Sequence, residues 1–394
     1  MTTIIRNGFV YSPEPLGVRD IFVAGGRIAA LAKPGTLRLE GFPVEEVEAR
    51  DKIVLPGFID GHVHILGGGG EGGPVTRAPE IRIEEIAASG VTTVIGCLGT
   101  DSVTRHPASL LAKARALEAE GVSTFIFVGA YDVPPPTLTG SVRSDLVLID
   151  KVIGAGEVAV SDHRSSQPGF GDIARLAAEC RVGGLLGGKA GVLHLHLGDG
   201  PRRLELLFRL IAETEIPITQ IIPTHVNRNP ELFAEALRWA AAGGSFDLTA
   251  GPDPEPASGE LSVEEAVRLA LERGIPLARV TVSSDANGSL PVFDRAGNLT
   301  GLTIATPRDL FRAFRSLLRK KITGPEGAAR LFAANAAAFY KLPGKGALAT
   351  GMDADVILLD KDFGLTDVWA RGRRLMADGR LLARSTFGPT NGGL

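Results

Sequence analysis

The sequence has 394 residues, of which 44% are hydrophobic and 22% charged, and this composition is typical of a compact globular enzyme rather than a disordered chain. Its net charge of -3 gives no electrostatic reason to expect binding to nucleic acid or to an anionic membrane. The first residues lack the apolar segment of a signal peptide, and no apolar run is long enough to span a bilayer, so we expect a cytoplasmic protein.

Only two cysteines occur, Cys97 and Cys180. Two are too few for a disulfide framework in a chain of this size. Each lies in an apolar strand or helix pattern, which favours a buried thiol.

Both ends of the chain are predicted to form one small β domain. The segment before residue 53 shows short strand patterns separated by turns, without a convincing helix. The same texture returns near the C-terminus. We therefore expect a small β-sandwich-like domain made of residues 1–52 and 343–394, beside a larger domain.

Residues 53–342 repeat the pattern of an apolar strand, a loop and an amphipathic helix, which is typical of βα units around a parallel sheet. Eight such repeats over about 280 residues fit a (β/α)8 TIM-type barrel in number and length. The strand candidates are residues 53–64, 91–99, 122–131, 157–163, 191–198, 218–227, 245–250 and 279–285. Helical patterns cover residues 107–120, 201–214, 230–242, 262–273, 307–320 and 325–340, several with proline in the first turn.

Side chains with catalytic chemistry gather at the ends of these predicted strands. His62 and His64 lie one residue apart, so the period of a strand points both imidazoles to the same side, where they can bind one metal ion. The active site of such a barrel lies at the C-terminal ends of its strands. Core histidines would not be expected to follow the strand ends, which favours a metal site. The further candidates at predicted strand ends are Tyr131, Glu157, His196, His225 and Asp285.

The remaining histidines, His106, His163 and His194, are expected to be structural or to support a ligand. Glu71 follows the glycine run 67–70, whose freedom would let it enter a site, although a solvated loop acid is the simpler interpretation. A phosphate-binding loop is disfavoured because the Lys-Ser/Thr ending of such loops is absent.

Three stretches carry a family resemblance: PGFIDGHVH, TVSSDANGS and GALATGMDADVILLD. They resemble the amidohydrolase superfamily. Within it, the chain is similar to the isoaspartyl (β-aspartyl) dipeptidase family along nearly its whole length. The local matches are HVHILGGGGEGGPVTRAPE, GTDSVTRHP, GAYDVP, SDHRS, RVGGLLGGK, HLGD, PTHVNRN and SSDANGS.

The resemblance implies a centre of two divalent metal ions, expected to be Zn²⁺, and a small isoaspartyl dipeptide as substrate. Such a dipeptide carries an ammonium and carboxylates around its bond, so its recognition needs an acid and arginine forks. The family's metal ligands match His62, His64, His196, His225 and Asp285. In its substrate pocket the match to Glu71 binds the α-amino group, Tyr131 polarises the scissile carbonyl, Arg164 and Arg228 receive the α-carboxylate, and Ser289 and the loop around Thr100 complete the pocket.

The chain departs from the family pattern at the fourth strand. The best-known members supply a carboxylated lysine there, whose carbamate bridges the two metals. Counting back from Ser161-Asp162-His163-Arg164 places Glu157 at this point, while Lys151 and Lys189 belong to other local patterns. Glutamate would bridge without modification but has a shorter side chain; alternatively, Glu157 is a buried acid beside a mononuclear site.

The expected reaction is hydrolysis of the β-aspartyl peptide bond by a hydroxide bridging two ions roughly 3.5–4 Å apart. Asp285 would pass the proton to the leaving amine, and Tyr131 would stabilise the oxyanion. One alternative is another hydrolase of the superfamily, either a cyclic-amide hydrolase or an N-acyl amino acid deacetylase. A second is a non-catalytic barrel relative, which should have lost ligands. The resemblance also implies a large homo-oligomer, with an octamer as one expected size.

Overall fold

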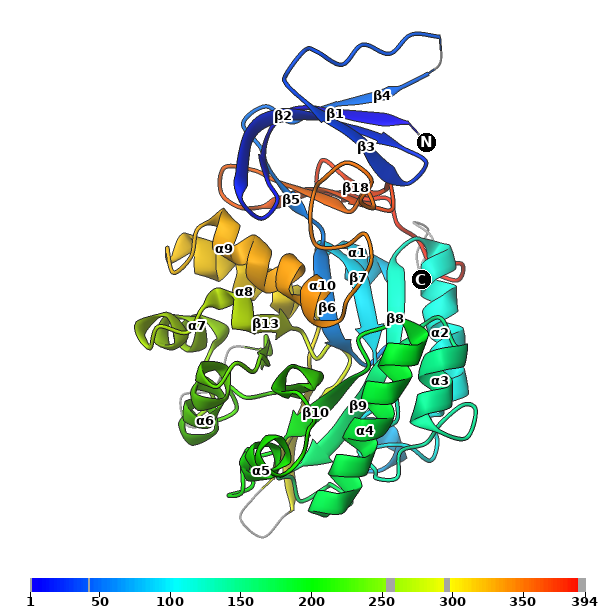
Figure 1. The fold of residues 1–394 in the computed structure, drawn as a ribbon. Coiled ribbons are helices and arrows are strands. Elements are labelled where there is room, and N and C mark those ends of the chain that lie inside the picture. The colour runs from blue at the N-terminus through cyan, green and yellow to red at the C-terminus, as the bar shows by residue number, and fades with distance from the viewer. Residues whose placement is uncertain (1, 42, 253–258, 294–297, 389–394) are drawn as a thin grey trace.

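The computed structural model describes residues 2–41, 43–252, 259–293 and 298–388. A barrel of parallel strands, surrounded by helices, forms the larger part, and a mixed β-sheet lies against one end of it (Figure 1). The predicted TIM-type barrel with a separate β domain is confirmed. No helix in these four segments is long and apolar enough to cross a membrane.

The β domain is a nine-stranded sheet that combines the two ends of the chain, here called the terminal sheet. Its two halves meet where β5 pairs antiparallel with β16, with Ile53 opposite Leu359 and Pro56 opposite Val356. Apolar side chains from both halves, including Val54 and Trp369, form its own buried core. Its strands are β1 (Thr3–Tyr11), β2 (Pro15–Ala24), β3 (Arg27–Ala32), β4 (Glu45–Glu48), β5 (Ile53–Pro56), β16 (Val356–Leu359), β17 (Leu365–Ala370), β18 (Arg373–Ala377) and β19 (Arg380–Leu381).

A buried carboxylate ties the two halves of the terminal sheet together. Asp367 accepts hydrogen bonds from Lys52 Nζ at 3.0 Å and from Arg374 Nη2 at 2.5 Å. Burial raises the pKa of the Asp367 carboxyl, but the bonds from Arg374 and Lys52 outweigh it and hold the pKa below its ordinary value. The N-terminal and C-terminal segments are therefore joined by charge as well as by strand pairing.

The barrel strands follow one another in chain order. Six of them form a continuous parallel sheet from β6 to β11, and β12 pairs with β13 beside it. The ring closes where β13 contacts β6: His64 N donates to Ala286 O at 2.9 Å, and Ser284 N donates to Asp60 Oδ1 at 3.0 Å. These strands are β6 (Phe58–Val63), β7 (Val91–Gly96), β8 (Ser123–Val128), β9 (Val152–Val160), β10 (Val192–Leu197), β11 (Ile221–Thr224), β12 (Phe246–Thr249) and β13 (Val280–Ser283).

Local sequence signals explain where several outer helices begin. Asn229 Oδ1 accepts from Leu232 N at 2.8 Å ahead of Pro230, which fits the first helical turn. Ser262 and Glu265 form a reciprocal capping box at α7. The helices are α1 (Ile83–Ala87), α2 (Pro107–Glu120), α3 (Val142–Leu148), α4 (Phe170–Gly187), α5 (Glu205–Glu213), α6 (Pro230–Ala241), α7 (Val263–Glu272), α8 (Pro307–Arg319), α9 (Pro325–Ala329) and α10 (Asn335–Phe339), with a π-helical turn at Arg330–Ala334 and short 3₁₀ turns at Pro74–Thr76, Ile218–Gln220 and Leu277–Arg279.

The structure corrects the predicted strands at three places. The strand expected over 53–64 is two strands, because β5 pairs in the terminal sheet while β6 starts the barrel. Gly57 separates them, and a Cβ there would lie 2.3 Å from Thr92 Cγ2; we propose it as the domain junction. The fourth barrel strand begins at Val152, ahead of the predicted 157. A hairpin that the pattern did not predict, β14 (Ser289–Phe293) and β15 (Leu299–Ile304), precedes α8.

Candidate metal centre

Four histidines and two carboxylates from separate barrel strands converge at the C-terminal ends of those strands. His62 lies in β6 and His64 directly follows it, Glu157 lies in β9 and His196 in β10. All are buried. Each of these six residues belongs to a group of side chains that could hold a metal ion, and the six are here called the metal cluster: His62, His64, Glu157, His196, His225 and Asp285.

Glu157 stands at the centre of the metal cluster, and its two oxygens face different histidines. Oε1 lies 3.3 Å from His64 Nε2. Oε2 lies 3.0 Å from His196 Nδ1, 3.4 Å from His225 Nε2 and 3.5 Å from His62 Nε2. One carboxylate is thus within reach of both histidine pairs.

Asp285 completes the metal cluster from the opposite side. Its Oδ1 lies 3.0 Å from His64 Nε2 and 3.5 Å from His62 Nε2. Among the described residues, His62 Nε2 is a buried polar atom without a hydrogen-bond partner. Because an unpaired buried polar group is costly, and because imidazole and carboxylate are the ligands of zinc-like ions, these residues fit a metal site.

The carboxylates of the metal cluster are held in the charged form. Burial raises the pKa of Glu157, but the facing imidazoles of His62 and His196 outweigh it and hold that pKa well below its usual range. Burial likewise opposes ionisation of Asp285, yet a hydrogen bond from His64 and the nearby histidines bring its pKa to about 2. Two buried anions among imidazole nitrogens form a site that favours cations.

Two residues of the metal cluster have a strained backbone. His225 has a φ of 59° and Asp285 a φ of 53°, both in the left-handed region that residues other than glycine rarely adopt. Such conformations persist only where the surroundings impose them, and they concentrate at functional sites. Asp60 helps to impose the conformation of Asp285, because its carboxylate accepts hydrogen bonds from the backbone N–H and the hydroxyl of Ser284, the preceding residue.

Two side chains next to the metal cluster, His194 and Thr249, orient two of its histidines. His194 Nε2 lies 2.8 Å from His62 Nδ1, which leaves His62 Nε2 facing the carboxylates. Thr249 Oγ1 lies 2.6 Å from His225 Nδ1 and leaves His225 Nε2 facing Glu157. Outer partners of this kind fix the ring that a metal ligand presents. The supporting position predicted for His194 agrees with this contact.

Tyr131 and Asp162 surround the ring of His196. Tyr131 Oη lies 2.9 Å from His196 Nδ1. On the other side, Asp162 Oδ2 lies 2.9 Å from His196 Nε2 and accepts from Arg164 Nη2 at 2.8 Å. Arg164 also lies over the ring of Tyr131, with 5.5 Å between Cζ and the ring centre. The structure therefore brings Tyr131 and Arg164 to the edge of the metal cluster.

Glu71 lies beside this edge, in contact with three residues predicted for the substrate pocket. Its carboxylate accepts from Ser289 Oγ at 2.9 Å and from Thr100 Oγ1 at 3.1 Å, and Arg164 Nη1 lies 3.4 Å away. The glycine run lets the loop reach this position, since a Cβ on Gly67 would lie 2.1 Å from Ala78 O. The solvated loop acid considered from sequence is wrong, because the Glu71 side chain is only 7% exposed.

Arg228 lies near the same mouth, and its Nε donates to Leu197 O at 3.2 Å, at the last residue of β10, the strand that carries His196. His106 and His163 are exposed and lie outside the metal cluster. Cys97 is buried, as predicted, but its sulfur lies among the metal cluster.

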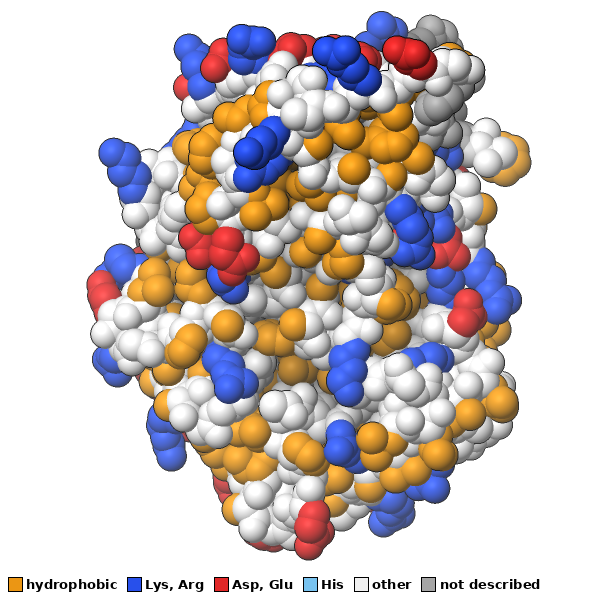
Figure 2. Space-filling view, turned by 45° about the horizontal axis from the view of Figure 1, so that its top comes forward, with side chains coloured by type: hydrophobic (Ala, Val, Ile, Leu, Met, Phe, Trp, Pro, Cys, Tyr) orange, Lys and Arg blue, Asp and Glu red, His pale blue; other side chains and the backbone are white. Residues whose placement is uncertain are grey.

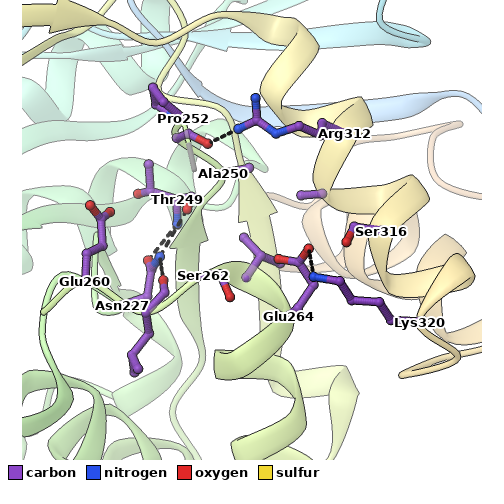
Figure 3. Close-up of a pocket in the computed structure, with 14 residues that line it drawn as sticks. Asn227, Thr249, Ala250, Pro252, Glu260, Ser262, Glu264, Arg312, Ser316 and Lys320 are labelled. Atoms are coloured by element: carbon purple, nitrogen blue, oxygen red, sulfur yellow. Dashed lines mark hydrogen bonds and ion pairs between the residues drawn. The ribbon is translucent and has the colours of Figure 1, made fainter. Parts of the chain in front are cut away.

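A pocket outside the metal cluster lies between α7 and α8 (Figure 3). Asn227 and Thr249 border it on the barrel side, and Asn227 Nδ2 donates to Thr249 O at 3.1 Å. At its other wall Lys320 Nζ lies 3.2 Å from Glu264 Oε1. Thr249, which lines the pocket, lies 2.6 Å from His225 Nδ1 of the metal cluster through its Oγ1.

Solved structures provide the strongest comparison. The chain is 44% identical to a β-aspartyl dipeptidase from Fervidobacterium islandicum AW-1 in complex with β-Asp-Leu, covering 98% of this chain and 100% of that one, with a TM-score of 0.91. A dihydropyrimidinase from Brevibacillus agri NCHU1002 is 16% identical over 98% of this chain and 97% of its own, with a TM-score of 0.68, and shares the fold. An enamidase described as a member of the amidohydrolase superfamily is 18% identical over 98% of this chain and 99% of its own, with a TM-score of 0.67.

Curated relatives match more weakly. An adenine deaminase from Halalkalibacterium halodurans is 24% identical over 98% of this chain, which spans 59% of that protein's length. A dihydroorotase from Solibacter usitatus is 31% identical over 41% of this chain and 35% of its own. The chain thus spans less than two thirds of these curated relatives. No protein-family model matches it.

A TIM-type barrel with histidines and carboxylates at its mouth, beside a sheet made from both chain ends, is the architecture that this chain shares with the solved structures above. Identity over the whole length of a solved relative then narrows the class. The chain belongs to the β-aspartyl dipeptidase family.

Proposed function

We propose that the chain hydrolyses the β-aspartyl peptide bond of isoaspartyl dipeptides at a centre of two divalent metal ions, with Zn²⁺ as the metal. One observation carries this proposal: an acid and an arginine, which could bind the α-amino group and the α-carboxylate of a dipeptide, lie directly beside the metal cluster. Glu71 lies 3.4 Å from Arg164, and Arg164 Nη2 lies 3.4 Å from His196 Nε2. The β-Asp-Leu bound by the relative from F. islandicum is a ligand of this chemistry.

The proposed ligands divide into two groups that share one carboxylate. His62 and His64 would hold one ion and His196 and His225 the other, with Glu157 between them in place of a carboxylated lysine. Bound ions of this kind polarise a carbonyl and lower the pKa of water toward 7, which supplies the nucleophile. The proposal that both ions share Glu157 is supported by its two oxygens, because Oε1 faces His64 and Oε2 faces His196.

Asp285 is proposed to move the proton. Its carboxylate is ionised and buried in the site, so it can accept a proton from the attacking water and donate it to the leaving amine. Both transfers need one group that stays within hydrogen-bond reach, and the backbone strain at Asp285 fixes its position.

The remaining site residues are proposed to bind the dipeptide. Glu71, with Thr100 and Ser289 beside it, would receive the α-amino group of the aspartyl residue. Arg164 and Arg228 would bind the α-carboxylate of the leaving amino acid, since a guanidinium matches a carboxylate bidentately. Tyr131, whose hydroxyl already reaches His196, would donate to the developing oxyanion.

The terminal sheet supports a proposed homo-oligomer, of which an octamer is the size implied by resemblance. Figure 2 shows hydrophobic side chains gathered over this domain. Exposed large apolar residues of its first strands include Phe9, Leu16 and Val18. Apolar patches on a surface mark interaction sites. A cytoplasmic location stays a prediction from the sequence.

The test is release of free aspartate from β-Asp-Leu, with α-Asp-Leu as the matched control and a metal count on the same preparation. We expect hydrolysis of the β-linked dipeptide alone, about two ions per chain, loss of activity on chelation and its return with Zn²⁺. A preparation that opened a cyclic amide or deacetylated N-acyl amino acids, but left β-Asp-Leu intact, would contradict the proposal.

A further inference from the structure

Cys97 lies at the top of the barrel interior, next to the first metal-binding histidines. β7 ends at Gly96, which pairs with Val63 of β6. Cys97 N then donates to Val63 O at 3.0 Å, which sets Cys97 beside His64 across the strand boundary. Its side chain is 1% exposed and packs in the interior cluster with Ile95.

The sulfur of Cys97 lies against the metal cluster. It makes a long contact of 3.7 Å to Val63 O. It lies within 4.8 Å of the ligand atoms of His62, His64 and Glu157, and those atoms all lie within this distance of one another. A second observation points to a ligand at the same place, since His62 Nε2 is buried without a hydrogen-bond partner. Such atoms can meet around one ion, because Zn–S and Zn–N bonds are about 2.0–2.3 Å long.

We propose that Cys97 is a further protein ligand of the metal position held by His62 and His64. This inference rests on the proposed metal centre and adds a sulfur donor to it. A thiolate favours Zn²⁺ over ions that prefer oxygen ligands, such as Mg²⁺ or Mn²⁺. It also adds negative charge beside His62 and His64, which face the two oxygens of Glu157 at 3.5 and 3.3 Å. The protein donors proposed around this position then include His62, His64, Glu157 and Cys97, with Asp285 Oδ1 3.0 Å from His64 Nε2 beside them.

Cys180 shows the alternative, a thiol that only fills the core. It lies in α4, is fully buried in the main apolar core and belongs to none of the groups that could hold a metal among the described residues. Burial raises the pKa of its thiol to about 12. Cys180→Ala therefore removes the second thiol of the chain without touching the metal cluster, and is the matched control.

The test uses Co²⁺, because a cobalt–thiolate bond gives a strong near-ultraviolet charge-transfer band that imidazole and carboxylate ligands do not give. We expect this band in Co²⁺-loaded wild-type protein and in Cys180→Ala, and its loss in Cys97→Ser and Cys97→Ala. Competition with a chelator should show that one of the bound ions is held about 10–100-fold more weakly in the Cys97 variants, the size of effect seen when metal-site support is removed.

The outcomes separate this inference from the proposed metal centre. If wild-type protein binds about two Co²⁺ ions without a thiolate band, Cys97 is a core thiol and the inference is overturned, while the binuclear centre stands. If it binds one ion with the band, Cys97 is a ligand and the binuclear centre fails. Because the wild-type spectrum decides, a Cys97 variant that failed to fold would not prevent the test.

Discussion

At the scale of single residues, Glu71 shows how the pocket is set before a substrate binds. Its carboxylate is held by Ser289 and Thr100 and shares a charge contact with Arg164. Glu71→Gln keeps the shape but removes the charge, so we expect kcat/KM for β-Asp-Leu to fall about 10–100-fold, the worth of a hydrogen bond to a charged group.

An N-acetylated β-Asp-Leu lacks the ammonium, and its slower hydrolysis should change little in Glu71→Gln. Glu80→Gln, on the same loop with an exposed side chain that contacts Lys113, is the control and should leave both rates unchanged. Equal losses on the two substrates in Glu71→Gln would remove the proposed role in binding the amine.

Glu157 allows a sharper test of the metal centre. Glu157→Ala should lower the metal content from about two ions per chain toward one, because a shared ligand is lost and the cations then face each other with less negative charge. Elemental analysis of purified protein measures this. Wild-type protein stripped and reloaded without bicarbonate should regain metal and activity, because no carbamate is needed. A variant that kept both ions would show that Glu157 does not bridge.

The histidines could be predicted because a strand places alternate residues on one face, and because barrel sites lie at strand ends. Cys97, Thr249 and Asp162 could not be assigned from the same pattern. A cysteine in an apolar strand looks like any core residue, and the contact of Asp162 with His196 depends on two strands meeting in space. The spacing of residues along a strand predicts which face a side chain lies on. Which residue it contacts depends on how the strands pack together in the fold.

At the scale of elements, Asp367 links strands from the two ends of the chain. Asp367→Asn should lower the free energy of unfolding by about 3 kcal/mol, the low end for breaking a buried ion pair, because Lys52 and Arg374 keep partial contact with water. Calorimetry should show a lower melting temperature. Asp378→Asn is the control, since this exposed carboxylate also lies near Lys52 yet should have little effect.

The ion pairs of Asp367 with Lys52 and Arg374 also predict that the stability of the fold depends on pH. Because the folded-state pKa of Asp367 is lowered, its stabilisation is fully present above the unfolded value of about 3.9 and is lost as the pH falls through the folded value. The difference in stability between wild type and Asp367→Asn should therefore be constant near neutral pH and shrink below pH of about 4. A difference that grew on acidification would contradict the ion-pair interpretation.

The alternation of strand and helix patterns predicted the barrel, because each strand and each helix shows its own periodicity of apolar residues. The division of 53–64 at Gly57 was hidden, since both β5 and β6 are apolar and only their partners differ. The hairpin of β14 and β15 was missed for the opposite reason. The side chains of β15 are largely exposed, so this strand has no buried apolar face that would mark it in the sequence.

At the scale of the whole molecule, bound metal should stabilise the fold. The metal cluster takes side chains from β6, β9 and β10 and from the segments after β11 and β13, so ions would connect strands around the ring. A ligand present at about 100 times its Kd adds about 2.7 kcal/mol to folding. Chelation should lower the melting temperature, and Zn²⁺ should restore it. An unchanged transition would show that the described side chains do not hold the ion.

The pairing of β5 with β16 also governs how the chain is made. About 300 residues separate these strands, and at roughly 5–20 residues per second a ribosome needs about 15–60 s to produce them. During that time the edge of β5 that pairs with β16 has no partner, while its other edge pairs with β1. A barrel that began folding during synthesis would hold β5 at a defined place while the C-terminal half of the terminal sheet was still being translated. Truncated nascent chains would then expose an unpaired strand edge that chaperones could bind.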